Sequence, residues 1–124
     1  MPASEARLAP GTVVRVPFPY TDAEARQHRP ALVFAAAGPG QEPFLIWVVM
    51  ITSAENRGWP GDVEIPDAGK AGLPAASVVR TAKIATIDFL RAEPKGRIEP
   101  ATMAAVSAEI AARLGMSPQI GAGG

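Results

Sequence analysis

An unbroken apolar run that stops at two hydroxyl residues is the feature that most constrains this sequence. Residues 44–51 read FLIWVVMI, are rich in β-branched and aromatic side chains, and follow Pro43. Such a run predicts a strand that is buried on both faces. It passes directly into Thr52 and Ser53, so a rigid strand end would hold both hydroxyls in place for binding or chemistry. The alternative is that they only satisfy backbone groups in a turn.

Composition limits what the chain can be. Its 124 residues are enough for one domain with its own core. It has no cysteine and a single histidine, His28, so we expect no disulfide, no metal site and no cofactor. The 12 basic and 12 acidic residues balance, which argues against coating nucleic acid through bulk charge. We see no signal peptide and no apolar run near the roughly 20 residues of a membrane span, so we expect a cytoplasmic protein without membrane contact.

Short strands dominate the rest of the pattern. Apolar or alternating segments bounded by proline, glycine and polar turns predict strands. Around the central run they are residues 12–16, 31–37, 62–65, 77–80 and 83–87, with a further short strand within 91–98.

A helix is predicted only at the end of the chain. Met103, Val106, Ile110 and Leu114 recur at three- and four-residue steps, Pro100 suits the first turn, and the residue after Leu114 is glycine. Five to seven short strands and one helix favour a small closed or half-closed barrel. We therefore expect a flexible leader over residues 1–10, one barrel domain over 11–115, and a disordered tail over 116–124.

Arg29 stands at the entrance to the predicted strand 31–37. A guanidinium group matches phosphate geometry and keeps its charge, so Arg29 is a candidate anion ligand. The alternative is a surface ion pair with an acidic residue of the preceding loop.

The order of these segments resembles the MazF/PemK family of toxins from type II toxin–antitoxin systems. The similar blocks are GTVVRVPFPYTD at 11–22, RPALV at 29–33, ITS at 51–53, SVVR at 77–80, KIATID at 83–88 and the final amphipathic helix. The resemblance runs from about Gly11 to Gly115. It implies a mainly β fold, a small SH3-like barrel with a C-terminal helix, and a homodimer.

The resemblance also implies an activity. Toxins of this family cleave single-stranded RNA at short sequences without a metal, and the residues that match their catalytic pair are Arg29 and Thr52. The RNA 2′-hydroxyl would attack the adjacent phosphate and leave a 2′,3′-cyclic phosphate, so the protein has to orient the strand, stabilise charge and move protons. Ser53 is a candidate helper.

Further residues are candidates for proton transfer or RNA contact. Glu24 and His28, in the loop before Arg29, are candidate general bases, and the alternative for both is a solvated loop. Arg80 is a candidate RNA-binding residue, and others are Phe18, Tyr20, Arg57, Trp59 and Lys83.

Two other functions compete with an endoribonuclease. A toxin with the same barrel, like the related CcdB toxins, would bind a protein such as DNA gyrase without catalysis. The chain ends in a glycine tail without an aromatic anchor, which disfavours that function. The third is an inactive binding module. A toxin would also have a cognate antitoxin, whose partly disordered acidic tail we expect over the groove that holds Arg29 and Thr52.

Overall fold

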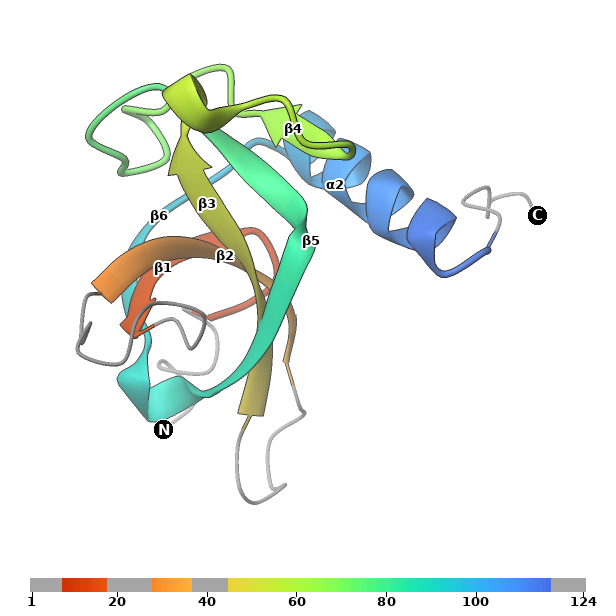
Figure 1. Cartoon of the computed structure of the whole chain (residues 1–124). Helices are drawn as coiled ribbons and strands as arrows, with labels where there is room; N and C mark the ends of the chain where they lie inside the picture. Colours follow the sequence, from red (N-terminus) through yellow and green to blue (C-terminus); the bar gives the residue numbers. More distant parts are fainter. Residues whose placement is uncertain (1–7, 18–27, 37–44, 117–124) are drawn as a thin grey trace.

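The computed structural model describes residues 8–17, 28–36 and 45–116. Within these ranges the chain forms six strands, two short 3-10 helices and one α-helix (Figure 1). The elements are β1 (Thr12–Pro17), β2 (His28–Ala36), β3 (Leu45–Ser53), η1 (Ala54–Asn56), β4 (Asp62–Glu64), β5 (Ser77–Asp88), η2 (Phe89–Arg91), β6 (Glu93–Arg97) and α2 (Pro100–Arg113). The predicted mainly β fold with one C-terminal helix is confirmed.

All six strands belong to one antiparallel sheet in the order β4-β5-β3-β2-β1-β6. Along the described chain β4 and β6, the two edges, form no ladder with each other, so the strands alone leave the barrel open at that seam. The loop after β4 contacts β6. Gly72 has φ +80°, and a Cβ there would lie 2.3 Å from the carbonyl oxygen of Lys95 in β6. Glycine lets the two backbones meet at this point.

Two apolar clusters fill the fold, one on each face of the curved sheet. The first contains Val13, Leu32, Val49 and Ile51, and Val106 and Ile110 of α2 pack into it. The second is built from the alternate positions, Val14, Val16, Ala31, Val33 and Val48, together with Leu8, which is 3% exposed. Alternation along a strand explains this division, because successive side chains point to opposite faces.

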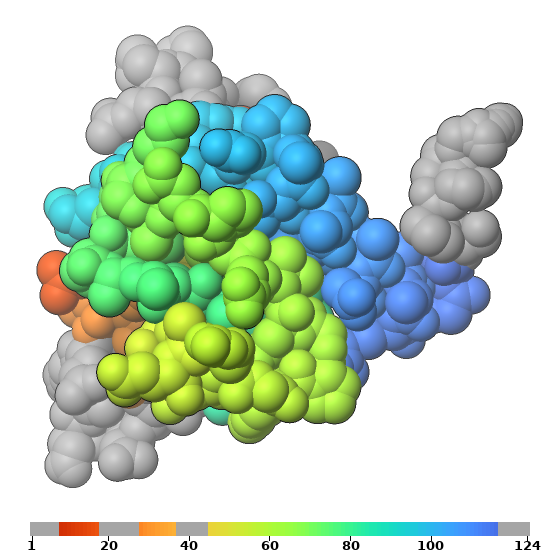
Figure 2. All heavy atoms as spheres, turned by 90° about the horizontal axis from the view of Figure 1, so that it is seen from above, coloured from red at the N-terminus to blue at the C-terminus, as the bar shows by residue number. Residues whose placement is uncertain are grey.

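Helix α2 lies against β4 and β5 (Figures 1 and 2). Its side chains Thr102, Val106 and Ile110 are buried, and the Arg113 guanidinium donates to the carbonyl oxygen of Pro60 at 3.2 Å. The helix ends where predicted, with Gly115 at φ +76°. Leu114, which was predicted to share the apolar face, is instead 67% exposed, because it stands after the last helical turn as the C-cap.

Three further predictions need correction. The two strands expected at 77–80 and 83–87 are one strand, β5, which bends at a register shift opposite Val49 and Met50. The central strand is not buried on both faces throughout, because Leu45 and Trp47 are exposed at its start. The alternation of polar and apolar residues over 62–65 predicts a half-exposed strand with its polar side chains outward, but the side chain of Asp62 is only 8% exposed.

Other expectations fall outside the described residues. Most of the predicted leader, the tail from residue 117 onward, and the loop residues Phe18, Tyr20 and Glu24 lie there. Among the residues that are described, no helix is long and apolar enough to cross a membrane.

Candidate functional site

Arg29 lies at the beginning of β2 and Thr52 near the end of β3. These strands are antiparallel and pair Ala31 with Met50 and Leu32 with Val49, so both residues lie at the same end of the strand pair. Ala31 and Met50 are the last pair of the ladder, and the same register continued by two residues would set Arg29 opposite Thr52. Residues directly opposite in an antiparallel pair share a face and have Cβ atoms about 5 Å apart.

The pair stands at the end of the second apolar cluster. Val16 of β1 is the ladder partner of Arg29, and Val16 and Ala31 both belong to that cluster, against which Met50 packs. Both Arg29 and Thr52 are partly buried. Both residues belong to strands whose neighbouring side chains are buried, so their backbone positions are fixed. A binding or catalytic pair needs such fixed positions.

The Thr52 hydroxyl has a partner that sequence reasoning missed. Asn56, the last residue of η1, donates from Nδ2 to Thr52 Oγ1 at 3.1 Å. The backbone carbonyl of Asn56 in turn accepts from Arg80 Nη2 at 2.6 Å. The only signal in the sequence is the four-residue spacing from the strand end, which is too common to single out Asn56.

Ser53 has a different task from its neighbour. Its Oγ accepts from the backbone N–H of Glu55 at 3.2 Å and so caps η1. Alternation also points Ser53 away from the face that carries Thr52. The turn chemistry weighed for both hydroxyls thus describes Ser53, and the structure does not bring Ser53 to Arg29.

His28 is likewise separated from the pair. It is the exposed first residue of β2, one position from Arg29, so alternation directs it to the opposite face. There it lines a groove of about 390 Å³ with Arg15, Pro30 and Lys95 among others. Glu24, the other candidate base, lies outside the described residues.

Arg80 is held in a buried ion pair with Asp62. The Nε and Nη2 atoms of Arg80 donate to Oδ1 and Oδ2 of Asp62 at 3.1 and 2.8 Å, and Arg80 is only 6% exposed. The strand ladder explains the contact, because β5 places Arg80 between Met50 of β3 and Asp62 of β4. The guanidinium group of Arg80, a candidate for binding RNA phosphate, is therefore paired with a carboxylate inside the protein.

The environment of Asp62 favours its charged form. Burial alone would raise the pKa of Asp62, but the hydrogen bond from Arg80, the backbone N–H groups of Trp59 and Gly58 and the charge of Arg80 together lower it below the ordinary 3.8. The two backbone bonds are each 3.2 Å long. Asp62 thus ties together Arg80 and the turn that follows η1.

Trp59 covers this ion pair and remains 45% exposed. The Arg80 guanidinium carbon lies 4.2 Å from its ring centroid and the Lys83 Nζ lies 5.3 Å from it. Both are cation–π distances. Arg57, on the same turn, is exposed; its Nη1 donates to the carbonyl oxygen of Ala54 at 2.8 Å, and its Nε lies 3.8 Å from a carboxylate oxygen of Glu64. The turn that follows η1 thus presents an exposed aromatic ring and an exposed cation.

The site offers a guanidinium group and a hydroxyl group. Over the described residues we find no group of three or more histidine, aspartate or glutamate side chains that could hold a metal ion. A guanidinium group and a hydroxyl donor both suit the oxygens of a phosphate group.

Comparison with known proteins adds to this geometry. Residues 9–114 match the profile of the PemK-like, MazF-like toxins of type II toxin–antitoxin systems. A search among curated proteins gave no match. The chain is similar to the solved MazE–MazF complex (Form-II) from Deinococcus radiodurans, with 27% identity, a TM-score of 0.68, and 88% of this chain and 96% of that chain covered. MazF (Form-I) from the same organism gives 27% identity, the same TM-score, and coverage of 87% and 96%.

A more distant structure agrees in fold. An endoribonuclease in complex with its cognate antitoxin from a mycobacterial species shares 21% identity, with a TM-score of 0.66 over 86% of this chain and 94% of that chain. The expected MazF-like fold is thereby confirmed. Since the family profile spans nearly all of the folded chain, this protein belongs to the PemK-like, MazF-like toxins of type II toxin–antitoxin systems.

Proposed function

We propose that this toxin is a sequence-specific, metal-independent endoribonuclease that cleaves single-stranded RNA and thereby inhibits growth, with Arg29 and Thr52 as its catalytic residues. The observation that carries the proposal is the register of β2 and β3, which ends at Ala31 and Met50 and, continued by two residues, would set Arg29 opposite Thr52. Family membership supports it.

The two side chains suit cleavage by the RNA itself. The 2′-oxygen forms a bond to phosphorus while the bond from phosphorus to the 5′-oxygen breaks, which gives a 2′,3′-cyclic phosphate and a free 5′-hydroxyl. Arg29 binds the nonbridging oxygens as their charge increases and is a candidate proton donor to the leaving oxygen. Thr52 donates its hydroxyl proton to the same phosphate. Loss of one such donor typically costs about 10²- to 10³-fold in rate.

A general base has to remove the 2′-proton. Of the two candidates, alternation along β2 favours Glu24 over His28, because His28 falls on the face away from Thr52. Glu24→Gln should then abolish cleavage, and His28→Ala should leave it within about threefold of the wild type. The reverse result would make His28 the base.

Two protein partners follow from the same proposal. One is a cognate antitoxin, whose acidic segment would cover Arg29 and Thr52 and neutralise the positive charge of Arg29. The solved Deinococcus MazF structure with MazE supports such a partner. The other is a second copy of the chain in a two-fold homodimer built on an apolar surface beside the sheet.

The endoribonuclease activity is tested by measuring bacterial growth and mapping RNA 5′ ends in the same cells. Wild type, Arg29→Ala and Thr52→Ala are expressed inducibly in bacteria, and new 5′-hydroxyl RNA ends are mapped. We expect arrest with ends at a short recurring sequence for the wild type only. Arg91→Ala and Thr86→Ala change exposed residues of the same types elsewhere and should act like the wild type.

The other outcomes are equally informative. Arrest without new ends would favour a protein target such as DNA gyrase, and no arrest would favour an inactive binding module. Purified protein should cleave a mapped RNA equally well with EDTA, and loss of cleavage there would contradict metal independence. Thermal unfolding of each variant confirms that it is folded.

A further inference from the structure

We propose that Asn56 is a positioning residue, which holds the Thr52 hydroxyl as a hydrogen-bond donor toward the scissile phosphate, and that the buried Arg80–Asp62 pair holds Asn56 in place. This inference rests on the proposed function. It concerns three residues that are distant from Arg29 in the chain and that the proposed mechanism does not yet use.

The first step is the direction of the Thr52 hydrogen bond. A hydroxyl has one proton and two acceptor lone pairs, and Asn56 Nδ2 donates to one of these lone pairs at 3.1 Å. The proton of Thr52 therefore stays available for an acceptor outside the protein. The bond also stops the free rotation of the hydroxyl, so the donor is aimed before the substrate arrives.

The second step is what fixes Asn56. It is an exposed residue in a three-residue 3-10 turn, which by itself would hold a side chain poorly. Its carbonyl, however, accepts a 2.6 Å bond from Arg80 Nη2, and the side chain of Arg80 is only 7% exposed. Asp62 anchors the turn that follows η1 through the N–H groups of Gly58 and Trp59. The buried pair thus holds both the last residue of η1 and the turn after it.

The third step is the energetic cost of that pair. Taking two charges out of water costs several kcal/mol per ion, and well-packed apolar residues often stabilise a fold as well or better. Stability alone is therefore a poor reason for Arg80 and Asp62. Placing the turn that carries Asn56 beside Thr52 is a task that apolar side chains could not perform, because they cannot bind the carbonyl of Asn56.

Kinetics on a mapped RNA substrate test the inference. Asn56→Ala should lower kcat by about 10- to 100-fold and leave KM within about threefold, because the donor is misdirected in the transition state while RNA binding is kept. Glu55→Ala changes the neighbouring exposed residue of η1 and is the matched control, with unchanged kinetics. Asn56 is exposed, so Asn56→Ala should unfold at the same urea midpoint as the wild type.

The pH profile separates positioning from general damage. In Asn56→Asp the new carboxylate can only accept, so it draws the Thr52 proton to itself. We expect Asn56→Asp to be less active than Asn56→Ala from pH 8 down to pH 5, and to approach or exceed it only below about pH 4, where an exposed aspartate becomes protonated. Parallel profiles for the two variants would overturn the inference.

The Thr52→Ala background gives the second independent readout. If Asn56 acts through Thr52, Asn56→Ala adds no further loss to Thr52→Ala, and the double variant matches that single variant within about twofold. Additive losses would assign Asn56 a merely structural role. If the wild type does not cleave RNA, the proposed function fails and this inference fails with it. If the wild type cleaves and Asn56→Ala cleaves equally well, only this inference fails.

Discussion

The two ends of β3 differ in polarity: the strand begins at an apolar surface and ends at a polar one. Val48 and Val49 are completely buried in the middle. At the end of the strand, Thr52 and Ser53 are bound into a polar turn that rests on the Arg80–Asp62 pair. At its start, by contrast, the surface is apolar.

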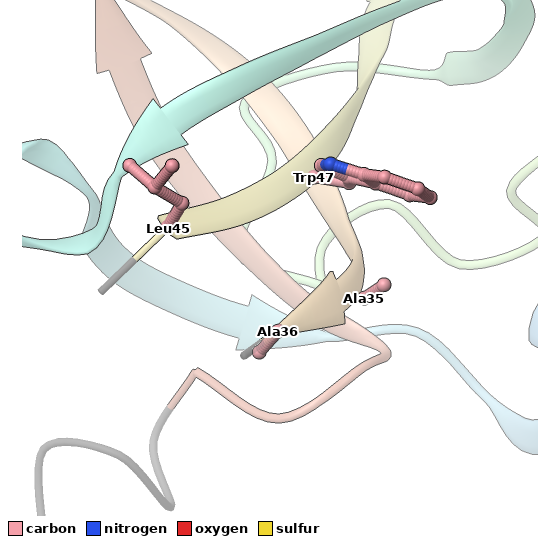
Figure 3. A pocket seen from close by; sticks show the side chains of 4 residues that line it. All are labelled: Ala35, Ala36, Leu45 and Trp47. Carbon is pink, nitrogen blue, oxygen red and sulfur yellow. The ribbon is translucent and has the colours of Figure 1, made fainter. Parts of the chain in front are cut away.

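Trp47 and Leu45 dominate that apolar end. They are 53% and 37% exposed and, with Ala35 and Ala36 of β2, line a shallow pocket of about 280 Å³ (Figure 3). The Trp47 ring projects away from the strand (Figure 3). The polar end is the one to which we assign the proposed chemistry, whereas the apolar end suits contact with another protein surface.

Removing one partner of the buried pair should have the largest effect. Arg80→Ala leaves Asp62 charged and buried, which we expect to cost about 3–5 kcal/mol of unfolding free energy. Urea unfolding measures this loss, and Arg91→Ala, at an exposed arginine, should cost less than about 0.5 kcal/mol. If Arg80→Ala loses as little unfolding free energy as Arg91→Ala, the buried Arg80–Asp62 pair does not stabilise the fold. Arg80→Met with Asp62→Leu should recover most of the stability but not the cleavage rate.

Acid should weaken the polar end selectively. The folded-state pKa of Asp62 is lowered, so the stability it contributes is present above its ordinary value of 3.8 and is lost as the pH falls below that value. Asp62→Asn has no such group. The difference in urea midpoint between wild type and Asp62→Asn should therefore be constant from pH 7 to 5 and shrink below about pH 4. If the difference in urea midpoint stays constant down to pH 3, the stability that Asp62 contributes does not depend on its negative charge.

Ser53→Ala should separate turn chemistry from catalysis. It removes the cap of η1, for which we expect a loss of about 0.5–2 kcal/mol in unfolding free energy. Cleavage by the folded variant should stay within about threefold of the wild type, because Ser53 points away from Thr52. A fall as large as that of Thr52→Ala would make Ser53 part of the catalytic group.

Trp47→Glu should have the smallest effect on the single chain. At a half-exposed position we expect a change below about 0.5 kcal/mol in stability, measured at high dilution. If the apolar end forms the homodimer contact, light scattering at micromolar concentration should show the variant as a monomer and the wild type as a dimer. Leu90→Glu, at another exposed apolar residue, should remain a dimer. A dimeric Trp47→Glu would place the contact elsewhere.

Much of the fold could be predicted from local pattern. The central strand, the strand that ends at Pro17 and the helix from Pro100 each have a hydrophobic period or a proline boundary, and all three are present. The errors fall where neighbours override local pattern. The turn-like break between Arg80 and Lys83 is a register shift within β5, and the alternation in β4 did not reveal that Asp62 would meet Arg80.

The candidate site was predicted less completely. Arg29 and Thr52 were singled out by their places at strand ends and by family resemblance, and Asn56 was not. No local pattern links Asn56 to Thr52 and Arg80, because the second contact joins residues 24 positions apart in the chain. Arg80 was singled out for its charge alone, which does not reveal an internal partner.

Hydrophobic period and proline boundaries act over a few residues, so local pattern was enough to predict the helix and most of the strands, though not the continuity of β5. Which polar groups meet depended instead on how the strands pair. Strand register placed Arg29 and Thr52 at the same end of the β2–β3 pair and Asp62 beside Arg80, and alternation directed Ser53 and His28 to the other face. Register depends on packing between strands that are distant in the chain, so it cannot be read from any one segment.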